Sequence, residues 1–157
     1  MNPDTVPARK QNKRREKEVA ILQAAEKVFA EEGFGGATMQ LIADAAQLPK
    51  ANVHYYFSTK EELYRQVVSN IFDVWLQAAG SFEESDGPAE GIGAYIDAKM
   101  EISRTRPAGS KVWASEVMHG APIIQDYLET TLVEWTNSRI QAIDAWIAAG
   151  LMDPISP

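Results

Sequence analysis

The sequence predicts an all-α fold, and two observations support this. Apolar residues recur at three- and four-residue spacing through most of the chain, as on the buried face of a helix, and no stretch alternates with a period of two. Gly and Pro interrupt these periodic stretches, which divides the chain into helices joined by turns. At 157 residues the chain is long enough for one sizeable core or two small ones.

Composition excludes several classes of function. The chain has no cysteine and only two histidines, His54 and His119, which argues against disulfides and metal sites. It has neither a Gly-rich phosphate loop nor a Ser–His pairing, so we expect no enzyme, no metal and no cofactor. No apolar run approaches the ~20 residues of a membrane span, and no signal peptide is present. We therefore expect a soluble cytoplasmic protein.

Charge is distributed unevenly. The formal net charge is −7, yet residues 1–66 hold ten Lys or Arg against nine Asp or Glu, a net of +1, while residues 67–157 carry −8. Six of the ten basic residues lie between Arg9 and Lys17, so we expect a basic flexible arm over residues 1–15. A polyanion would bind such an arm, for example through Arg14 and Arg15. A solvated disordered tail is an equally good interpretation of the charge run alone.

The first three helices are short and closely spaced. Periodicity predicts a helix from Glu16 to Glu32 that Gly33 closes. Thr38 is the expected N-cap of a second helix of barely two turns. Pro49 can open a third, running to about Tyr56, because its missing N–H falls where a helix has no internal partner.

Longer helices follow. Ser58 and Glu61 match a capping box at the start of a fourth helix, which ends before Gly80. After a polar loop, we expect helices from Pro88 to just before Pro107, from 110 to 119, and from about Ile124 to Gly150.

Two short helices joined by a tight turn, with another packed across them, form a helix-turn-helix, whose second helix can enter a DNA major groove. On that helix Val53 and Phe57 lie four apart and face inward. The outward residues can hydrogen-bond base edges or contact thymine methyls; they are Lys50, Ala51, His54 and Tyr55.

Phosphate contacts are expected beside this reading face. The N-terminus capped by Thr38 favours an anion. Lys60 stands in the first turn of the fourth helix, where the dipole disfavours a cation unless a phosphate lies nearby. Asn52 and Tyr56 can add neutral hydrogen bonds to the DNA backbone, although Tyr56 can equally be a structural ring.

Residues 16–68, with VFAEEGFGGATMQLIADAA followed by LPKANVHYYFSTKEELY, resemble the DNA-binding domain of TetR-family transcriptional repressors. The resemblance implies a bacterial homodimer that binds a palindromic operator, with a helical C-terminal domain that dimerises and binds a small inducer. It places base or phosphate contacts on Thr38, Gln40, Lys50, Ala51, Asn52, His54, Tyr55, Tyr56 and Lys60. Gln47, Pro49 and His54 depart from the Gly, Ser and Tyr common in the family.

The C-terminal part, through SKVWASEVMHGAPIIQDYL and WIAAGLMDPISP, is loosely similar to the pyrimidine-utilisation regulator branch. That similarity implies a nucleobase-like inducer and a chain truncated at the C-terminus relative to the family.

The predicted organisation is a basic flexible arm (1–15), a helix-turn-helix domain (16–60) and an incomplete helical regulatory domain (61–157). Aromatic and Met residues of the last part can line an inducer cavity or simply pack, and His119 can instead cap a helix C-terminus. The candidates for the cavity are Tyr95, Met100, Trp113, Met118 and His119. The alternative function is a helical adaptor that binds a small molecule or protein and does not use DNA.

Overall fold

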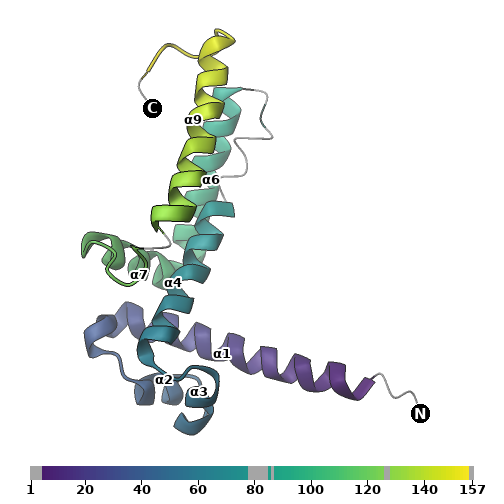
Figure 1. The fold of residues 1–157 in the computed structure, drawn as a ribbon, viewed down its shortest axis with the longest axis vertical. Coiled ribbons are helices and arrows are strands. Elements are labelled where there is room, and N and C mark those ends of the chain that lie inside the picture. Colours follow the sequence, from purple (N-terminus) through teal and green to yellow (C-terminus); the bar gives the residue numbers. More distant parts are fainter. Residues whose placement is uncertain (1–4, 78–84, 86, 126–127, 156–157) are drawn as a thin grey trace. The chain divides into compact units, whose positions relative to one another are not determined.

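The computed structural model describes residues 5–77, 85, 87–125 and 128–155. These residues form helices and turns and contain no strand, which confirms the all-α prediction (Figure 1). The chain divides into two compact units, Met1–Val68 and Ser69–Pro157. The division falls within helix α4 (Lys60–Gln77), whereas the predicted domain boundary, between residues 60 and 61, lies at the start of this helix.

Helix α1 (Thr5–Gly36) opens unit 1. It begins earlier than the predicted Glu16, because residues 8–20 are mostly Ala, Arg, Lys, Gln and Glu, which are strong helix formers. Pro7 lies in its first turn, where the missing N–H costs no hydrogen bond. Gly33 has φ 69° and ψ 172°, so the regular helix ends at the predicted glycine and one further turn follows.

Three helices complete the head of unit 1: α2 (Met39–Ala45), α3 (Lys50–Tyr56) and the start of α4 (Lys60–Gln77). Buried apolar side chains from all of them form one core. Phe29 packs edge-on against Tyr64, with ring centroids 4.8 Å apart, and Tyr64 lies 4.9 Å from Phe34. Ile42 and Val53 are fully buried and fix α2 and α3 to this core.

The capping box of α4 lies one residue later than predicted. Thr59 Oγ1 accepts the backbone N–H of Glu62, and Glu62 in turn accepts from the backbone N–H and hydroxyl of Ser58. These hydrogen bonds stabilise the carboxylate and lower the pKa of Glu62. Glu61, the predicted partner, is exposed.

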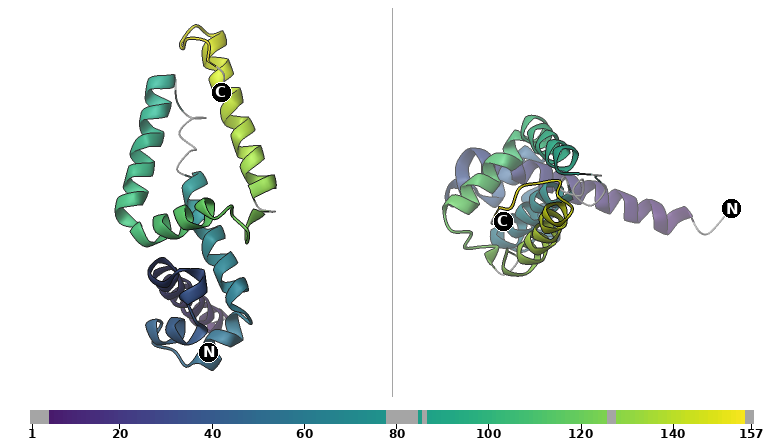
Figure 2. Two further views of the ribbon diagram at one scale, coloured as in Figure 1. Left: turned by 90° about the vertical axis from the view of Figure 1, so that its left-hand side faces the viewer. Right: turned by 90° about the horizontal axis from the view of Figure 1, so that it is seen from above.

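Unit 2 contains α6 (Pro88–Thr105), α7 (Pro107–Met118), a π-helical turn η1 (Leu128–Leu132) and α9 (Val133–Ala148). Figure 2 shows α6, α7 and α9 as three sides of a triangle. The ring of Trp146 on α9 lies so close to Gly91 on α6 that a Cβ there would come within 2.9 Å of it.

One predicted boundary in unit 2 was wrong. Helix α7 begins at Pro107 instead of residue 110, because proline suits the first helical position. The predicted helix from about Ile124 to Gly150 corresponds to η1 followed directly by α9, because Leu132, where they meet, keeps helical φ −69° and ψ −36°. A turn at Ala121–Ile124 precedes it, and residues 126–127 lie outside the described residues. Gly150, with φ 72°, follows the end of α9 as predicted.

Candidate nucleic-acid interface

The turn between α2 and α3 sets the direction of α3. Gln47 adopts φ 54°, its N–H bonds the carbonyl of Asp44 at 3.1 Å, and the N–H of Leu48 bonds the carbonyl of Ala43 at 3.0 Å. This is the Schellman arrangement, which usually places glycine where Gln47 stands. The turn therefore forms although Gln47 replaces the usual glycine, at the conformational cost of a left-handed residue with a side chain.

Pro49 is the N-cap of α3 and not its first helical residue, so α3 starts one residue later than predicted. Its carbonyl accepts the N–H of Asn52 at 2.8 Å, but its side chain cannot cap the helix.

The exposed face of α3 consists of the residues predicted to face outward. Lys50, Ala51 and His54 are exposed, and Tyr55 is 73% exposed. Val53 and Phe57 are buried, at 0% and 5% exposure. Asn52 and Tyr56 are half-buried at the edge, where the Tyr56 ring meets Tyr55 edge-on at 5.3 Å.

His54 has one ring nitrogen committed. Its Nδ1 lies 3.3 Å from the carbonyl oxygen of Ser58, and a carbonyl only accepts, so Nδ1 carries the hydrogen in this contact. In the neutral ring Nε2 is then a bare acceptor.

Two exposed residues predicted to contact DNA lie at the start of α2. Thr38 Oγ1 accepts the N–H of Leu41 at 3.1 Å, which confirms Thr38 as N-cap and leaves its hydroxyl hydrogen free to donate. Gln40 Nε2 donates to Asp44 Oδ1 at 2.8 Å, so this amide is held along the helix.

Lys60 has a structural role that its sequence position did not indicate. Its ammonium donates to the carbonyls of Phe34 at 2.7 Å and Ala37 at 3.0 Å, and lies 4.5 Å from the Phe34 ring centroid. The carbonyls of Phe34, in the last turn of α1, and of Ala37, just after it, thus compensate a cation in the first turn of α4. The third ammonium hydrogen remains for a phosphate, so the predicted DNA contact stays a prediction.

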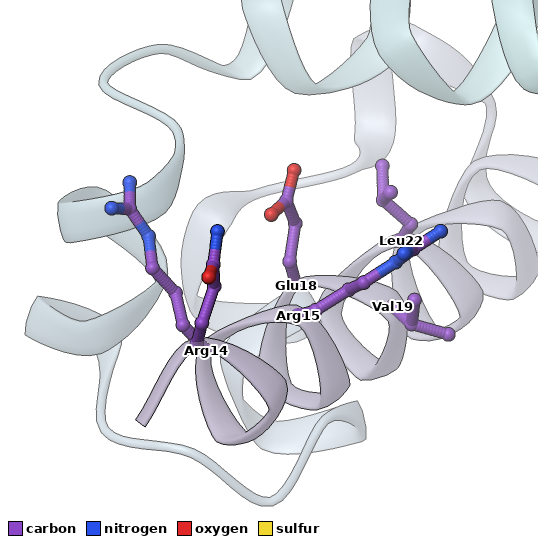
Figure 3. Close-up of a pocket in the computed structure, with 6 residues that line it drawn as sticks. Arg14, Arg15, Glu18, Val19 and Leu22 are labelled. Carbon is purple, nitrogen blue, oxygen red and sulfur yellow. The ribbon is translucent and has the colours of Figure 1, made fainter. Parts of the chain in front are cut away.

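The basic segment lies on the first half of α1. Lys13, Arg14, Arg15 and Lys17 are all exposed there. Figure 3 shows Arg14 and Arg15 beside a shallow furrow of about 370 Å³, with Glu18 between them and Val19 and Leu22 farther along. Every lining residue comes from α1, so this side of the helix is mixed in charge.

The predicted inducer-binding residues are spread over α6 and α7. Met100 and Met118 are exposed at 67% and 79%. Trp113 is half-buried against Phe72, with ring centroids 4.9 Å apart. His119 is the C-cap residue of α7 and its Nδ1 donates to the carbonyl of Ser115 at 2.6 Å, so its capping role is confirmed.

Sequence reasoning missed Lys99 on α6. Its ammonium donates to the carbonyl of Trp75 at 2.6 Å and lies 4.4 Å and 5.1 Å from the ring centroids of Trp75 and Tyr95. Partial burial lowers the pKa of Lys99 to about 8. The four-residue spacing from Tyr95 to Lys99 was the one available signal.

The sequence also gave no sign of the role of Glu116. This carboxylate is 5% exposed, and its Oε1 accepts the N–H of Ile123 at 3.1 Å. Glu116 fixes the turn after α7. In the described part of the chain no three His, Cys, Asp or Glu residues are grouped to hold a metal, and no helix is both long and apolar enough to cross a membrane.

Comparison with known families agrees with this geometry. Residues 21–67 match the family described as bacterial regulatory proteins, tetR family, and residues 68–157 match the YcdC-like protein, C-terminal region. The chain belongs to the TetR family of bacterial transcriptional regulators.

Among curated relatives, the HTH-type transcriptional regulator RutR of Escherichia coli K12 is 37% identical over 141 residues. That alignment covers 90% of this chain and 66% of RutR, so the chain spans just under two thirds of that relative. The negative regulator of the biofilm operon icaADBC, IcaR of Staphylococcus epidermidis, is 34% identical over 79% of this chain and 71% of IcaR.

Solved structures show the same fold. A TetR family regulator from Marinobacter aquaeolei aligns with a TM-score of 0.74 and 24% identity over 94% of this chain and 76% of that protein. A mutant of HlyIIR aligns with a TM-score of 0.73 and 22% identity over 91% of this chain and 77% of its own.

Proposed function

We propose that this protein is a ligand-responsive bacterial repressor that binds a palindromic operator as a homodimer in the cytoplasm. The observation that carries the proposal is α3: a helix fixed to the core by Val53 and Phe57 whose other face presents Lys50, Ala51, His54 and Tyr55 to solvent. Two copies of such a helix, one DNA turn or about 34–36 Å apart, read successive major grooves.

The exposed groups of α3 suit base edges. Lys50 donates to guanine O6 and N7, and the small Ala51 admits a thymine methyl. Tyr55 supplies a ring and a hydroxyl. His54, with Nδ1 held by Ser58, offers Nε2 as an acceptor for the amino group of adenine or cytosine.

Residues around α3 position it on the DNA backbone. Thr38, Gln40, Asn52 and Tyr56 offer neutral donors, while Lys60, Arg14 and Arg15 offer cations. These contacts set affinity and its dependence on salt, and they carry no base sequence information.

Unit 2 is the proposed inducer-binding and dimerisation part. The similarity to the pyrimidine-utilisation branch makes a nucleobase-like molecule the first ligand to test. Such a ligand would favour a form of the dimer in which the two recognition helices are wrongly spaced for the operator. A coupling free energy of only ~1–3 kcal/mol between ligand binding and operator binding is enough to release the DNA. Binding of a nucleobase panel, read as a shift in melting temperature, tests this part by itself.

Selection of duplexes from a random library, followed by titration of the enriched duplex and a scrambled one, tests the proposal. We expect wild type to favour the enriched duplex by at least about 10³-fold. Lys50→Ala and Tyr55→Ala should each lose about 1–3 kcal/mol of that preference. Lys27→Ala, an exposed lysine on the packed half of α1, is the matched control and should leave it intact.

If no duplex is enriched and Lys50→Ala and Tyr55→Ala bind DNA no differently from wild type, the repressor proposal fails. The adaptor alternative then remains.

A further inference from the structure

The first half of α1, residues 5–20, which we call the arm helix, projects beyond α2 and α3 (Figure 1). Of its described side chains, residues 11–20, none is buried, whereas Ile21 is fully buried one residue later. A helix of this length is marginal in water without tertiary packing. The arm helix therefore offers a surface that a partner can stabilise.

The register of α1 shows which side of the arm helix is cationic. Arg14 and Lys17 are spaced three apart, and Ile21, Ala25 and Val28 continue the same stripe at steps of four, four and three. Before Ile21 the stripe carries Arg14 and Lys17 with Glu18 at its edge, and after Ile21 it is apolar. Because Ile21, Ala25 and Val28 are buried in the core of unit 1, the cationic part lies on the side of α1 that faces this core.

This arrangement costs free energy in the absence of a partner. Lys13 and Lys17 are four residues apart, and like charges at this spacing repel each other and destabilise a helix. Glu18, four residues after Arg14 and half-buried, lies beside Arg14, so it offsets that cation first (Figure 3). A polyanion against the cationic stripe removes the repulsion.

We infer that the arm helix lies along the phosphate backbone next to the bases read by α3, with Lys13, Arg14 and Lys17 on phosphates. This rests on the proposed function and adds a second, oriented contact to it. The helix rises ~1.5 Å per residue, so the segment from Arg9 to Ile21 reaches ~18 Å, roughly five base pairs. Unlike a flexible basic tail, a helix presents these cations only on one side.

The salt dependence of binding to a long duplex of random sequence tests the contact. The triple variant Lys13→Gln/Arg14→Gln/Lys17→Gln keeps good helix formers and removes three charges. We expect the slope of log K against log salt to fall by about 0.9 for each phosphate that the variant no longer neutralises, hence by roughly two to three units. Lys27→Gln, on the packed half, should leave the slope unchanged.

Insertions test the orientation. Two alanines between Val19 and Ala20 keep every charge but turn the stripe by about 200°, and seven alanines restore its direction to within about 20°. We expect the two-residue insertion to reduce the slope nearly as much as the triple variant, and the seven-residue insertion to recover most of it. Far-UV circular dichroism and melting temperature check that each variant folds.

The outcomes separate the two proposals. If the triple variant keeps the wild-type slope of log K against log salt, the arm helix does not contact phosphates. If the two-residue insertion keeps that slope, the arm acts as a charged tail without fixed orientation, and the proposed helical docking is wrong. In either case, the preference for the enriched duplex over a scrambled one still tests α3. If the wild-type protein shows no preference for the enriched duplex, the proposed function is wrong, whatever the salt dependence of the variants.

Discussion

The two units differ in how completely they bury their apolar side chains. In unit 1 the described apolar residues are mostly buried, and the turns that orient α3 are closed by hydrogen bonds from Gln47, Leu48 and Lys60. Unit 2 leaves Ile96, Met100 and other large apolar residues of α6, α7 and α9 exposed. A reading surface needs a fixed scaffold, whereas loosely packed helices are those that a ligand can order.

The largest test of this comparison removes one core ring from each unit. Phe29→Ala, at 3% exposure in unit 1, and Phe72→Ala, at 2% in unit 2, should each cost about 3–5 kcal/mol where they pack. All four tryptophans lie in unit 2, so tryptophan fluorescence reports on unit 2. Phe29→Ala should lower hydrogen-exchange protection of residues 21–68 and barely move the fluorescence midpoint in urea, and Phe72→Ala should do the reverse.

If each variant instead moves both readouts equally, the chain unfolds as one cooperative core and the comparison does not hold.

A smaller effect is expected at Lys60. Lys60→Met keeps the length of the side chain but leaves the carbonyls of Phe34 and Ala37 without their donor, which should cost about 1–3 kcal/mol in the absence of DNA. Lys27→Met is the control and should be near neutral. Urea unfolding followed by far-UV circular dichroism measures the change in stability, and an unchanged midpoint for Lys60→Met would refute the structural role.

In unit 2, we expect stability to depend on pH because of Lys99. Its folded pKa of about 8 is below the ordinary 10.5, so the half-buried ammonium costs stability at neutral pH, and this cost fades as pH rises from 8 to 10.5. Lys99→Met lacks this dependence. Between pH 7 and pH 10 wild type should therefore gain about 1 kcal/mol relative to Lys99→Met, a figure reduced because solvent screens the exposed half. A constant difference would show that the ammonium is fully solvated.

The smallest expected effect is a gain in stability, in contrast to the losses above. Gln47→Gly removes the cost of a left-handed residue with a side chain and should stabilise unit 1 by about 0.5–1 kcal/mol. Gln23→Gly, in the middle of α1, should destabilise by about as much. Thermal unfolding measures both, and destabilisation by Gln47→Gly would mean that the Gln47 side chain contributes more than its backbone costs.

The sequence predicted unit 1 better than unit 2 for a physical reason. Thr38, Gly33 and the Val53–Phe57 spacing act within a few residues, so caps, ends and faces could be read from neighbours. The role of Lys60 depends on carbonyls 23 and 26 residues away, which no local pattern reveals. The Lys99 contact with the carbonyl of Trp75, 24 residues away, likewise depends on packing between distant segments.

The early start of α1 has a different cause. The charge run predicts a flexible arm, yet the same Arg, Lys, Glu and Gln residues are strong helix formers, and their helix propensity extends α1 to Thr5.

Amide chemical shifts of the isotopically labelled chain, recorded while the enriched duplex is added, test most directly whether α3 is the DNA-reading surface. If α3 reads the bases, the largest changes in chemical shift fall on Lys50 to Tyr56, with smaller ones at Thr38, Lys60 and the arm helix. Changes confined to residues 69–157, with α3 unaffected at saturating duplex, would contradict it.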